Sequence, residues 1–322
     1  MPVCRHRPPG IASGAMHTTE SSPDQRRVVH VAHSPDSDDA FMFYGLASGA
    51  VETGELSFEH ELEGIQELNE RAMRGELEVT AVSIHAYAYL TDRYVLLPHG
   101  ASMGEGYGPC LVGREPMDRE AIASSTVAVP GELTSAYLAL KLWEPRVRTV
   151  VMPFYSILEA VRDGTVELGL IIHEGQLTYA DEKLVLLEDL GRWWKEDTGL
   201  PLPLGGNVIR RDLGPELIPR ISDYLRKSIA FALEHREQAM EYAMGFARGL
   251  DRQTADDFVS MYVNSRTLDY GADGREAVRL FLARGVEAGL VPGPVTVEFV
   301  DQDVAGENAA PGQVPGSEVT LT

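Results

Sequence analysis

Short apolar runs alternate with amphipathic segments along the first two thirds of the chain. This alternation predicts an α/β fold, because buried strands joined by helices build mostly parallel sheets. The expected strands are 28–32, 78–82, 94–98, 107–112, 126–129, 149–152 and 167–172. The expected helices between them are 40–47, 64–74, 134–142 and 157–162.

The pattern changes near residue 216, where long amphipathic segments follow one another. Apolar residues, among them Leu217, Ile221, Leu225 and Ile229, recur at the 3.6-residue period of a helix. Further helices are expected at 236–248, 253–263 and 273–288, and a last strand at 295–300. The chain therefore ends in a mostly helical region.

Two lobes are expected, because 322 residues are many for one compact core and a new strand–helix series begins at 126. We predict a first lobe formed by 28–110 together with 207–302, and a second lobe formed by 111–206. Residues 1–27 and 303–322 have no hydrophobic periodicity, which is typical of a disordered leader and a disordered tail. A cleft between the two lobes is the expected place for a ligand.

Charge and composition exclude several classes of protein. The formal net charge of -21 argues against nucleic-acid binding and against docking on anionic membranes. No run approaches the roughly 18 apolar residues that span a bilayer. The only two cysteines, Cys4 and Cys110, exclude a disulfide framework. Because no signal-peptide run follows Arg5 and Arg7, we expect a cytoplasmic protein whose oligomeric state stays open.

The most informative stretch runs from 166 to 179. Its apolar run predicts a buried strand, and His173 and Glu174 follow where that strand ends. Open α/β sheets place ligand chemistry just past strand ends, and histidine exchanges a proton near neutral pH. We therefore take His173 as the candidate catalytic residue and Glu174 as its neighbour in the site. The alternative is a surface histidine in a loop.

Three other junctions between a strand and a helix carry hydroxyl groups. They are Ser34, the segment Ala81-Val82-Ser83, and Thr134-Ser135 after a Pro-Gly turn. The free amides and the positive dipole end of a helix favour a bound carboxylate at such a junction. Helix capping explains one hydroxyl of the Thr134-Ser135 pair and leaves the other for a ligand. As the N-cap of the next helix, Ser83 alone needs no further role.

An acidic turn of Asp36, Asp38 and Asp39 follows Ser34. Its spacing differs from that of a calcium loop, so we interpret Asp38 or Asp39 as the cap of the next helix. The chain also lacks a phosphate-binding loop, a zinc motif of the His-Glu-x-x-His type and a Gly-x-Ser-x-Gly elbow. We therefore expect no metal and no cofactor.

Together these residues resemble the 1,4-dihydroxy-6-naphthoate synthases of the futalosine route to menaquinone. The resemblance covers about residues 28–300 and is carried by Ser34-Pro35 with Asp39 and Phe41, Thr80 and Ser83 with Tyr87, Asp92-Arg93-Tyr94, Val129-Pro130-Gly131 with Thr134, Gly169 to Glu174, Thr178-Tyr179, Trp193 to Gly205, Arg211 to Gly214, and Tyr262 to Asn264. The His-Glu pair and the run Gly-Leu-Pro-Leu-Pro-Leu-Gly at 199–205 are its most specific parts.

The resemblance implies a two-lobed fold like that of type II periplasmic solute-binding proteins, here used by an enzyme. It implies a lyase of menaquinone biosynthesis that converts cyclic dehypoxanthinyl futalosine, a small carboxylate, to the bicyclic naphthoate. It also implies that His173 is the proton acceptor and that 81–83 and 134–135 hold the substrate. The alternatives are a non-catalytic solute-binding protein of the same fold and the related chorismate dehydratase.

Two positions depart from the pattern of the family. Asp38 stands where asparagine is usual, and Ala81 stands where a basic residue is usual. Both changes make the surroundings more negative, so carboxylate binding at that wall should be weaker. A substrate that is related to that of the family but chemically altered is therefore a further alternative.

Overall fold

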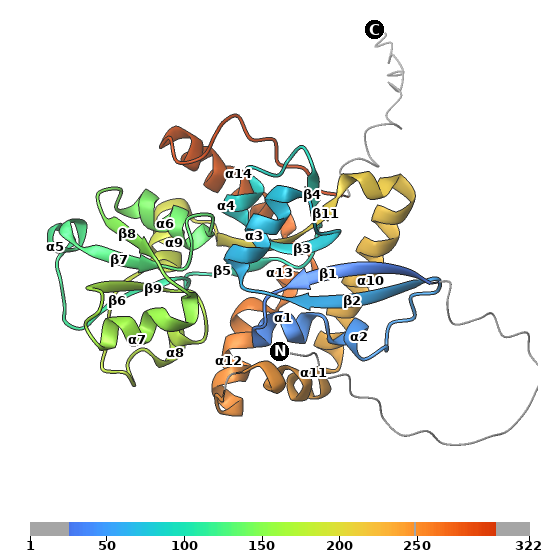
Figure 1. Cartoon of the computed structure of the whole chain (residues 1–322), viewed down its shortest axis with the longest axis horizontal. Helices are drawn as coiled ribbons and strands as arrows, with labels where there is room; N and C mark the ends of the chain where they lie inside the picture. Colours follow the sequence, from blue (N-terminus) through green and yellow to red (C-terminus); the bar gives the residue numbers. More distant parts are fainter. Residues whose placement is uncertain (1–25, 248, 301–322) are drawn as a thin grey trace, which may run out of the picture.

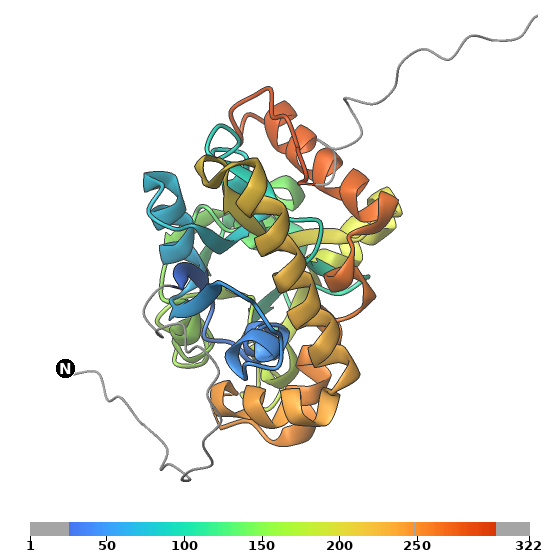
Figure 2. The ribbon, with the colours of Figure 1, turned by 90° about the vertical axis from the view of Figure 1, so that its right-hand side faces the viewer.

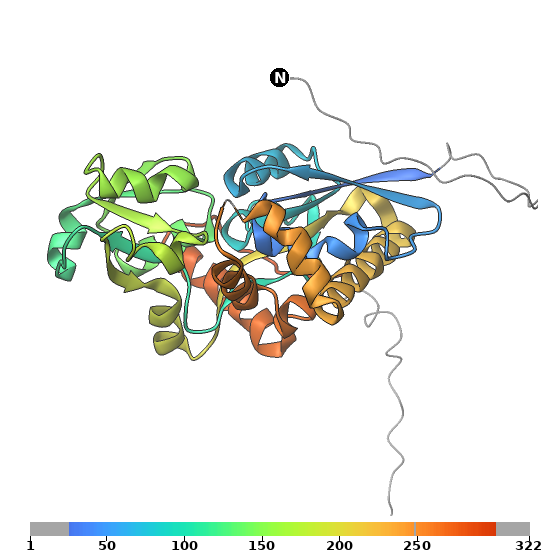
Figure 3. The same cartoon turned by 90° about the horizontal axis from the view of Figure 1, so that it is seen from below.

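The computed structural model describes residues 26–247 and 249–300 (Figure 1). These residues form two sheets side by side along the long axis of the molecule, each covered by helices (Figures 1 and 3). The predicted leader 1–27, apart from its last two residues, and the predicted tail 303–322 lie outside the described residues. Within the described residues, no helix is long and apolar enough to span a membrane.

The first sheet has the strand order β2-β1-β3-β11-β4, and β5 also pairs with β11. Its strands are β1 (Arg27–His33), β2 (Leu56–Leu62), β3 (Val79–Ser83), β4 (Tyr94–Leu96), β5 (Ser102–Gly104) and β11 (Leu202–Arg210). β1 is parallel to β2 and β3, whereas β11 is antiparallel to its three partners. The C-terminal ends of the parallel strands β1, β2 and β3 therefore lie on the same side of this sheet, the side that faces the second sheet (Figure 1).

The second sheet has the order β10-β6-β9-β7-β8. Its strands are β6 (Cys110–Gly113), β7 (Thr126–Val129), β8 (Arg148–Val151), β9 (Leu168–Ile171) and β10 (Val185–Asp189). β9 is buried along its whole length and runs parallel to β7, as its apolar sequence predicts. The chain joins this sheet at Cys110 and returns to the first sheet with β11, while the lobe boundaries at 110 and 206 stay a prediction.

Helices cover both sheets. Those around the first sheet are α1 (Ser37–Met42), α2 (Tyr44–Ala47), α3 (Ile65–Arg74), α4 (Ile84–Tyr87), α10 (Gly214–Glu234), α11 (Arg236–Ala243), α12 (Arg252–Tyr262), α13 (Ser265–Leu268) and α14 (Gly271–Glu287). Those around the second are α5 (Arg119–Ser124), α6 (Ser135–Trp143), α7 (Ile157–Arg162), α8 (Gly175–Thr178) and α9 (Leu190–Thr198). Figure 2 shows α10, in gold, crossing the outer end of the first sheet. Its apolar stripe packs on Val29 and Val31 of β1, as the helical period predicts.

Several predicted elements match the structure, and others need correction. Strand 126–129 and helix 157–162 are confirmed residue for residue. The predicted strand 295–300 is wrong, because this segment pairs only through an isolated bridge between Phe299 and Leu96. The predicted helix 40–47 is instead two short helices, α1 and α2, joined at Phe43. Strand β2 was not expected, because its half-buried Leu-Ser-Phe-Glu-His-Glu-Leu sequence has no continuous apolar run.

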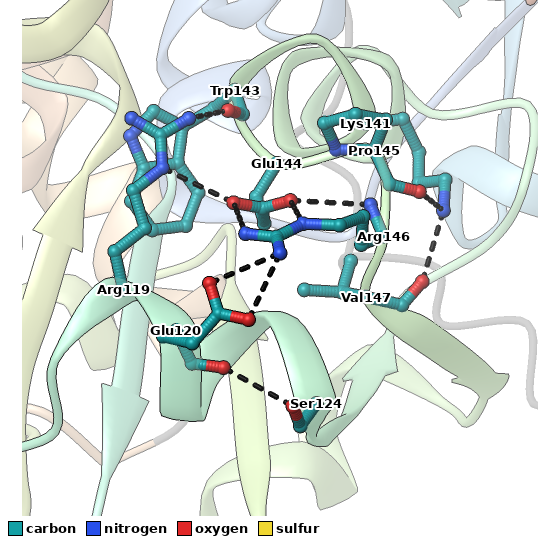
Figure 4. Close-up of polar contacts among 9 residues, drawn as sticks. All are labelled: Arg119, Glu120, Ser124, Lys141, Trp143, Glu144, Pro145, Arg146 and Val147. Atoms are coloured by element: carbon teal, nitrogen blue, oxygen red, sulfur yellow. Dashed lines mark hydrogen bonds and ion pairs between the residues drawn. The ribbon is translucent and has the colours of Figure 1, made fainter.

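A buried carboxylate fixes the C-terminal end of α6. Glu144 is 3% exposed and accepts hydrogen bonds from Arg146 Nε at 3.0 Å and Arg119 Nε at 3.1 Å (Figure 4). Arg119 also donates to the Trp143 carbonyl and lies over the indole ring. The hydrogen bonds from Arg146 and then Arg119 lower the pKa of Glu144 to about 2. This network anchors the helix whose opposite end is the predicted carboxylate site.

Glu144→Gln should lower the free energy of unfolding by about 1–3 kcal/mol at neutral pH, because two guanidinium groups lose their shared anion. Folding lowers the pKa of this acid, so its contribution is present above the unfolded pKa and is lost as the pH falls towards the folded value. The difference between variant and parent in urea unfolding should therefore shrink between about pH 5 and pH 2. Glu120→Gln, at an exposed partner of Arg146, is the control and should change stability by less than about 0.5 kcal/mol. A difference independent of pH would contradict this assignment.

Candidate functional site

A cavity of about 810 Å³, counted to its open mouth, is lined by residues of both sheets and their helices. Six predicted site residues line it: Ser34, Ala81, Val82, Ser83, Thr134 and Ser135. His173 and Glu174 are not lining residues, but they lie between Ile172 and Gln176, which are. The structure thus brings the predicted residues to one region, while their roles stay predictions.

The N-terminus of α6 forms one wall of this cavity. Thr134 Oγ1 caps the helix by accepting from Tyr137 N at 3.2 Å, and it donates to Gly131 O at 2.7 Å. Ser135 Oγ donates to Leu204 O at 2.5 Å and accepts from His85 N at 3.1 Å. The expectation of a spare hydroxyl is therefore wrong. The groups left for an anion are the first amides of the helix, which have no partner within it.

The adjoining wall is built on the end of β3, and α4, which follows β3, contacts α6 through the hydrogen bond from His85 to Ser135. Ser83 occupies the N-cap position of α4, as predicted, but its side chain makes no capping hydrogen bond. Instead, Asn69 Nδ2 donates to Ser83 Oγ at 3.1 Å, and Ser83 N donates to Asn69 Oδ1 at 2.9 Å. Asn69 is buried and thus fixes both the backbone and the side chain of Ser83. A rigid polar group at a strand end suits a binding wall.

His173 and Glu174 lie at the end of β9, as the sequence predicts. The His173 side chain is only 12% exposed, so its interpretation as a surface histidine is wrong. Gly175 N donates to His173 Nδ1 at 3.0 Å, and a Glu174 oxygen lies 3.9 Å from the same nitrogen. Because Nδ1 accepts a hydrogen bond, a neutral His173 ring carries its proton on Nε2. The edge of the ring also packs against Phe154 at 5.6 Å between ring centres.

The acidic turn lines the cavity, and its first member, Asp36, is the N-cap residue of α1. α1 begins at Ser37, so Asp38 and Asp39 lie in its first turn and neither is the cap, which corrects the prediction. Asp39 Oδ2 accepts from Ser34 N at 2.7 Å. Burial raises the pKa of Asp39 to about 6. Burial, and then the charges of Asp39, Asp36 and Glu174, raise the pKa of Asp38 well above its usual range.

Among the described residues, the charged side chains that line the cavity are all acidic. Throughout the described ranges, none of the residues lining the cavity is a lysine, arginine or histidine, whereas Asp36, Asp38 and Asp39 all are lining residues. Nor does the described part of the chain hold a group of three or more His, Cys, Asp or Glu side chains suited to a metal ion. An anionic ligand in this cavity would therefore depend on backbone amides and hydroxyl groups.

Four polar lining residues were not predicted: Ser102, Gln176, Asn207 and Tyr262. Tyr262 OH donates to Gln176 Oε1 at 2.7 Å, which joins α12 to α8. Asn207 lies on β11 directly opposite Ala81 of β3. Gln176 lies within the stretch 166–179 that the sequence singles out, whereas Ser102, Asn207 and Tyr262 reach the site through the pairing of distant segments.

Comparison with known proteins decides the family. The menaquinone biosynthesis family matches residues 29–287. This chain belongs to that family. It is 42% identical to the 1,4-dihydroxy-6-naphthoate synthase of Thermus thermophilus over 267 residues, which are 83% of this chain and 97% of the relative. It is 40% identical to the enzyme of the same name from Streptomyces coelicolor, with 84% and 98% covered.

Solved structures agree with the fold. A protein from Archaeoglobus fulgidus is 46% identical, with a TM-score of 0.79, and the match covers 82% of this chain and 98% of that one. The alkanesulfonate-binding protein of Xanthomonas axonopodis pv. citri has a TM-score of 0.63 at 11% identity, with 84% and 96% covered. The second likeness shows the fold alone. It confirms the predicted α/β fold of the periplasmic-binding-protein kind.

Asp38→Asn should raise the free energy of unfolding above pH 6, by on the order of 1 kcal/mol. Folding raises the pKa of this acid, so the folded state loses stability as the pH rises through the range in which Asp38 ionises. The asparagine side chain cannot ionise, so the variant keeps the stability that the parent loses. This difference in the free energy of unfolding should disappear in acid, where Asp38 is protonated in the parent as well. Urea unfolding at several pH values measures it, with exposed Asp92→Asn as the control. A variant less stable than its parent at pH 8 would show that the Asp38 carboxylate stabilises the fold.

Proposed function

We propose that this protein is a 1,4-dihydroxy-6-naphthoate synthase, a carbon–carbon lyase that converts cyclic dehypoxanthinyl futalosine to the naphthoate. The observation that carries the proposal is the identity of 40–42% across 97–98% of the length of two relatives with that name. The cavity adds support, because its lining includes the strand end beside His173 and a helix N-terminus suited to a carboxylate. The proposal includes a cytoplasmic location.

The lining suggests how this substrate would lie. Its carboxylate would bind the first amides of α6 beside Ser135 and Ala136, since no cation lines the cavity in the described ranges. The acidic turn would repel a carboxylate, but its oxygens accept hydrogen bonds from hydroxyl groups. We therefore place the sugar-derived, hydroxyl-bearing part of the substrate beside Asp36, Asp38 and Asp39.

His173 is the proposed general base. The lone pair of Nδ1 is the proton-accepting group of this tautomer, and the Gly175 amide already binds it. Catalysis therefore requires this local hydrogen bond to open when substrate enters, so that the ring faces the cavity. Proton removal would then start carbon–carbon cleavage, which the aromaticity of the new ring drives. Glu174 would orient the ring and stabilise its protonated form, because a carboxylate beside an imidazolium favours the charged state.

The direct test incubates the purified protein with cyclic dehypoxanthinyl futalosine and follows the naphthoate by mass spectrometry. Naphthoate that increases linearly with enzyme concentration supports the proposal. Binding of the substrate without any product would favour a solute-binding protein of the same fold. Conversion of chorismate, but not of the futalosine derivative, would favour the related dehydratase.

His173→Asn should lower kcat by about 10²–10⁴, the usual contribution of a positioned general base. The ring does not line the cavity, so the dissociation constant of the substrate should stay within about tenfold of the parent value. Glu174→Gln should lower kcat less, because it changes only the neighbour of the base. His30→Asn is the matched control, since His30 lies exposed on β1. Normal turnover by His173→Asn would remove His173 from the mechanism.

A further inference from the structure

Two buried hydrogen bonds join the two halves of the molecule at the segment that carries His173. Tyr262 of α12 donates to Gln176 of α8 at 2.7 Å, and Ser37 of α1 donates to Glu174 at 3.3 Å. Both donors belong to helices on the first sheet, and both acceptors follow β9 of the second sheet. The strand end with the candidate base is therefore held from across the cavity as well as from its own sheet.

Gln176 transmits this contact towards His173. Its Nε2 donates to Ile171 O at 3.4 Å, at the last residue of β9. Its backbone N donates to His173 O at 2.9 Å. Gln176 thus connects Tyr262 to both ends of the turn 171–176, and His173 lies within this turn. Loss of the Tyr262 bond would free the amide of Gln176 and loosen that turn.

Tyr262 is suited to this task. Its ring packs edge-on against Phe258 at 5.2 Å and against Tyr107 at 5.8 Å between ring centres, so the direction of its hydroxyl is fixed. Burial raises the pKa of Tyr262 well above its usual value, so the hydroxyl keeps its proton and remains a donor. The groups near it include Cys110, Tyr107 and Asp38, and none of these is a cation.

We infer that Tyr262 is a positioning residue, which acts through Gln176 to hold the His173-bearing turn in the geometry needed for proton transfer. This inference rests on the proposed function only for its kinetic consequence. The positioning itself determines how rigidly residues 171–178 are held, and this rigidity is measurable without substrate.

Tyr262→Phe removes the hydroxyl and keeps the ring. Tyr94→Phe is the matched control, because Tyr94 is also buried and also donates at 2.7 Å, to Leu77 O within the first half of the molecule. Hydrogen exchange followed by mass spectrometry should show amides 173–179 exchanging about fivefold faster in Tyr262→Phe and unchanged in Tyr94→Phe. Equal exchange in both variants and the parent would overturn the inference, whatever the protein catalyses.

Kinetics provide the second arm. Tyr262→Phe should lower kcat about tenfold with KM within about twofold, since positioning of the base affects the reacting state more than substrate binding. In a Gln176→Met background the same change should have no further effect on kcat, because the connecting amide is gone. If Tyr262→Phe lowers kcat by the same factor in the Gln176→Met background as in the parent, the inference is overturned. A change confined to KM would also overturn it. A parent protein that forms no naphthoate would refute the proposed function and leave hydrogen exchange to decide the positioning role alone.

Discussion

Strand β11 is the constraint on which the site depends. It pairs with β3 along one edge and with β4 and β5 along the other, so it fixes the first sheet from its centre. Gly205 lies opposite Ser83, and the carbonyl of Leu204 accepts the hydrogen bond from Ser135. Residues 205–209 of β11 thus pair with β3, and Leu204 just before them meets the N-terminus of α6.

Glycine is required on this strand for a steric reason. A Cβ on Gly206 would lie 2.1 Å from the hydroxyl oxygen of Tyr270, and no rotation of Gly206 itself would relieve that contact. Glycine weakens a central strand, but close approach of another group makes it necessary here. A larger residue would have to displace the buried Tyr270 side chain or shift β11 itself.

Charge then determines which end of the cavity suits which part of a ligand. Burial raises the pKa of Asp38, and the charges of Asp39, Asp36 and Glu174 raise it further. Elsewhere in the lining, α6 offers its first amides and the positive end of its dipole. An anionic group gains at the helix and loses at the acidic turn, so a ligand with one carboxylate and several hydroxyls has one favoured orientation.

The sequence predicts the elements with strong local patterns and misses what depends on distant contacts. Strand 126–129 and the buried end of β9 follow from apolar runs, and the cap at Thr134 follows from its place after Pro-Gly. The second hydroxyl of that pair was misjudged, because Leu204 lies 69 positions away in the chain and no local pattern reveals it as an acceptor. Gln176 and Tyr262 were missed for the same reason, since each is an ordinary polar residue of a helix until the two meet.

The hydrogen bonds from Tyr262 to Gln176 and from Ser37 to Glu174 bear on the difference between a binder and an enzyme of this fold. A solute-binding protein gains affinity when the ligand itself joins its two halves. Here protein groups make part of that connection, and both bonds end on the turn that carries His173. These bonds hold a reactive side chain in position without any ligand, so they contribute less to ligand affinity. Interactions of this kind raise kcat more than they lower KM, because they act on the reacting state. The geometry around β9 is therefore better suited to catalysis than to retention of a ligand.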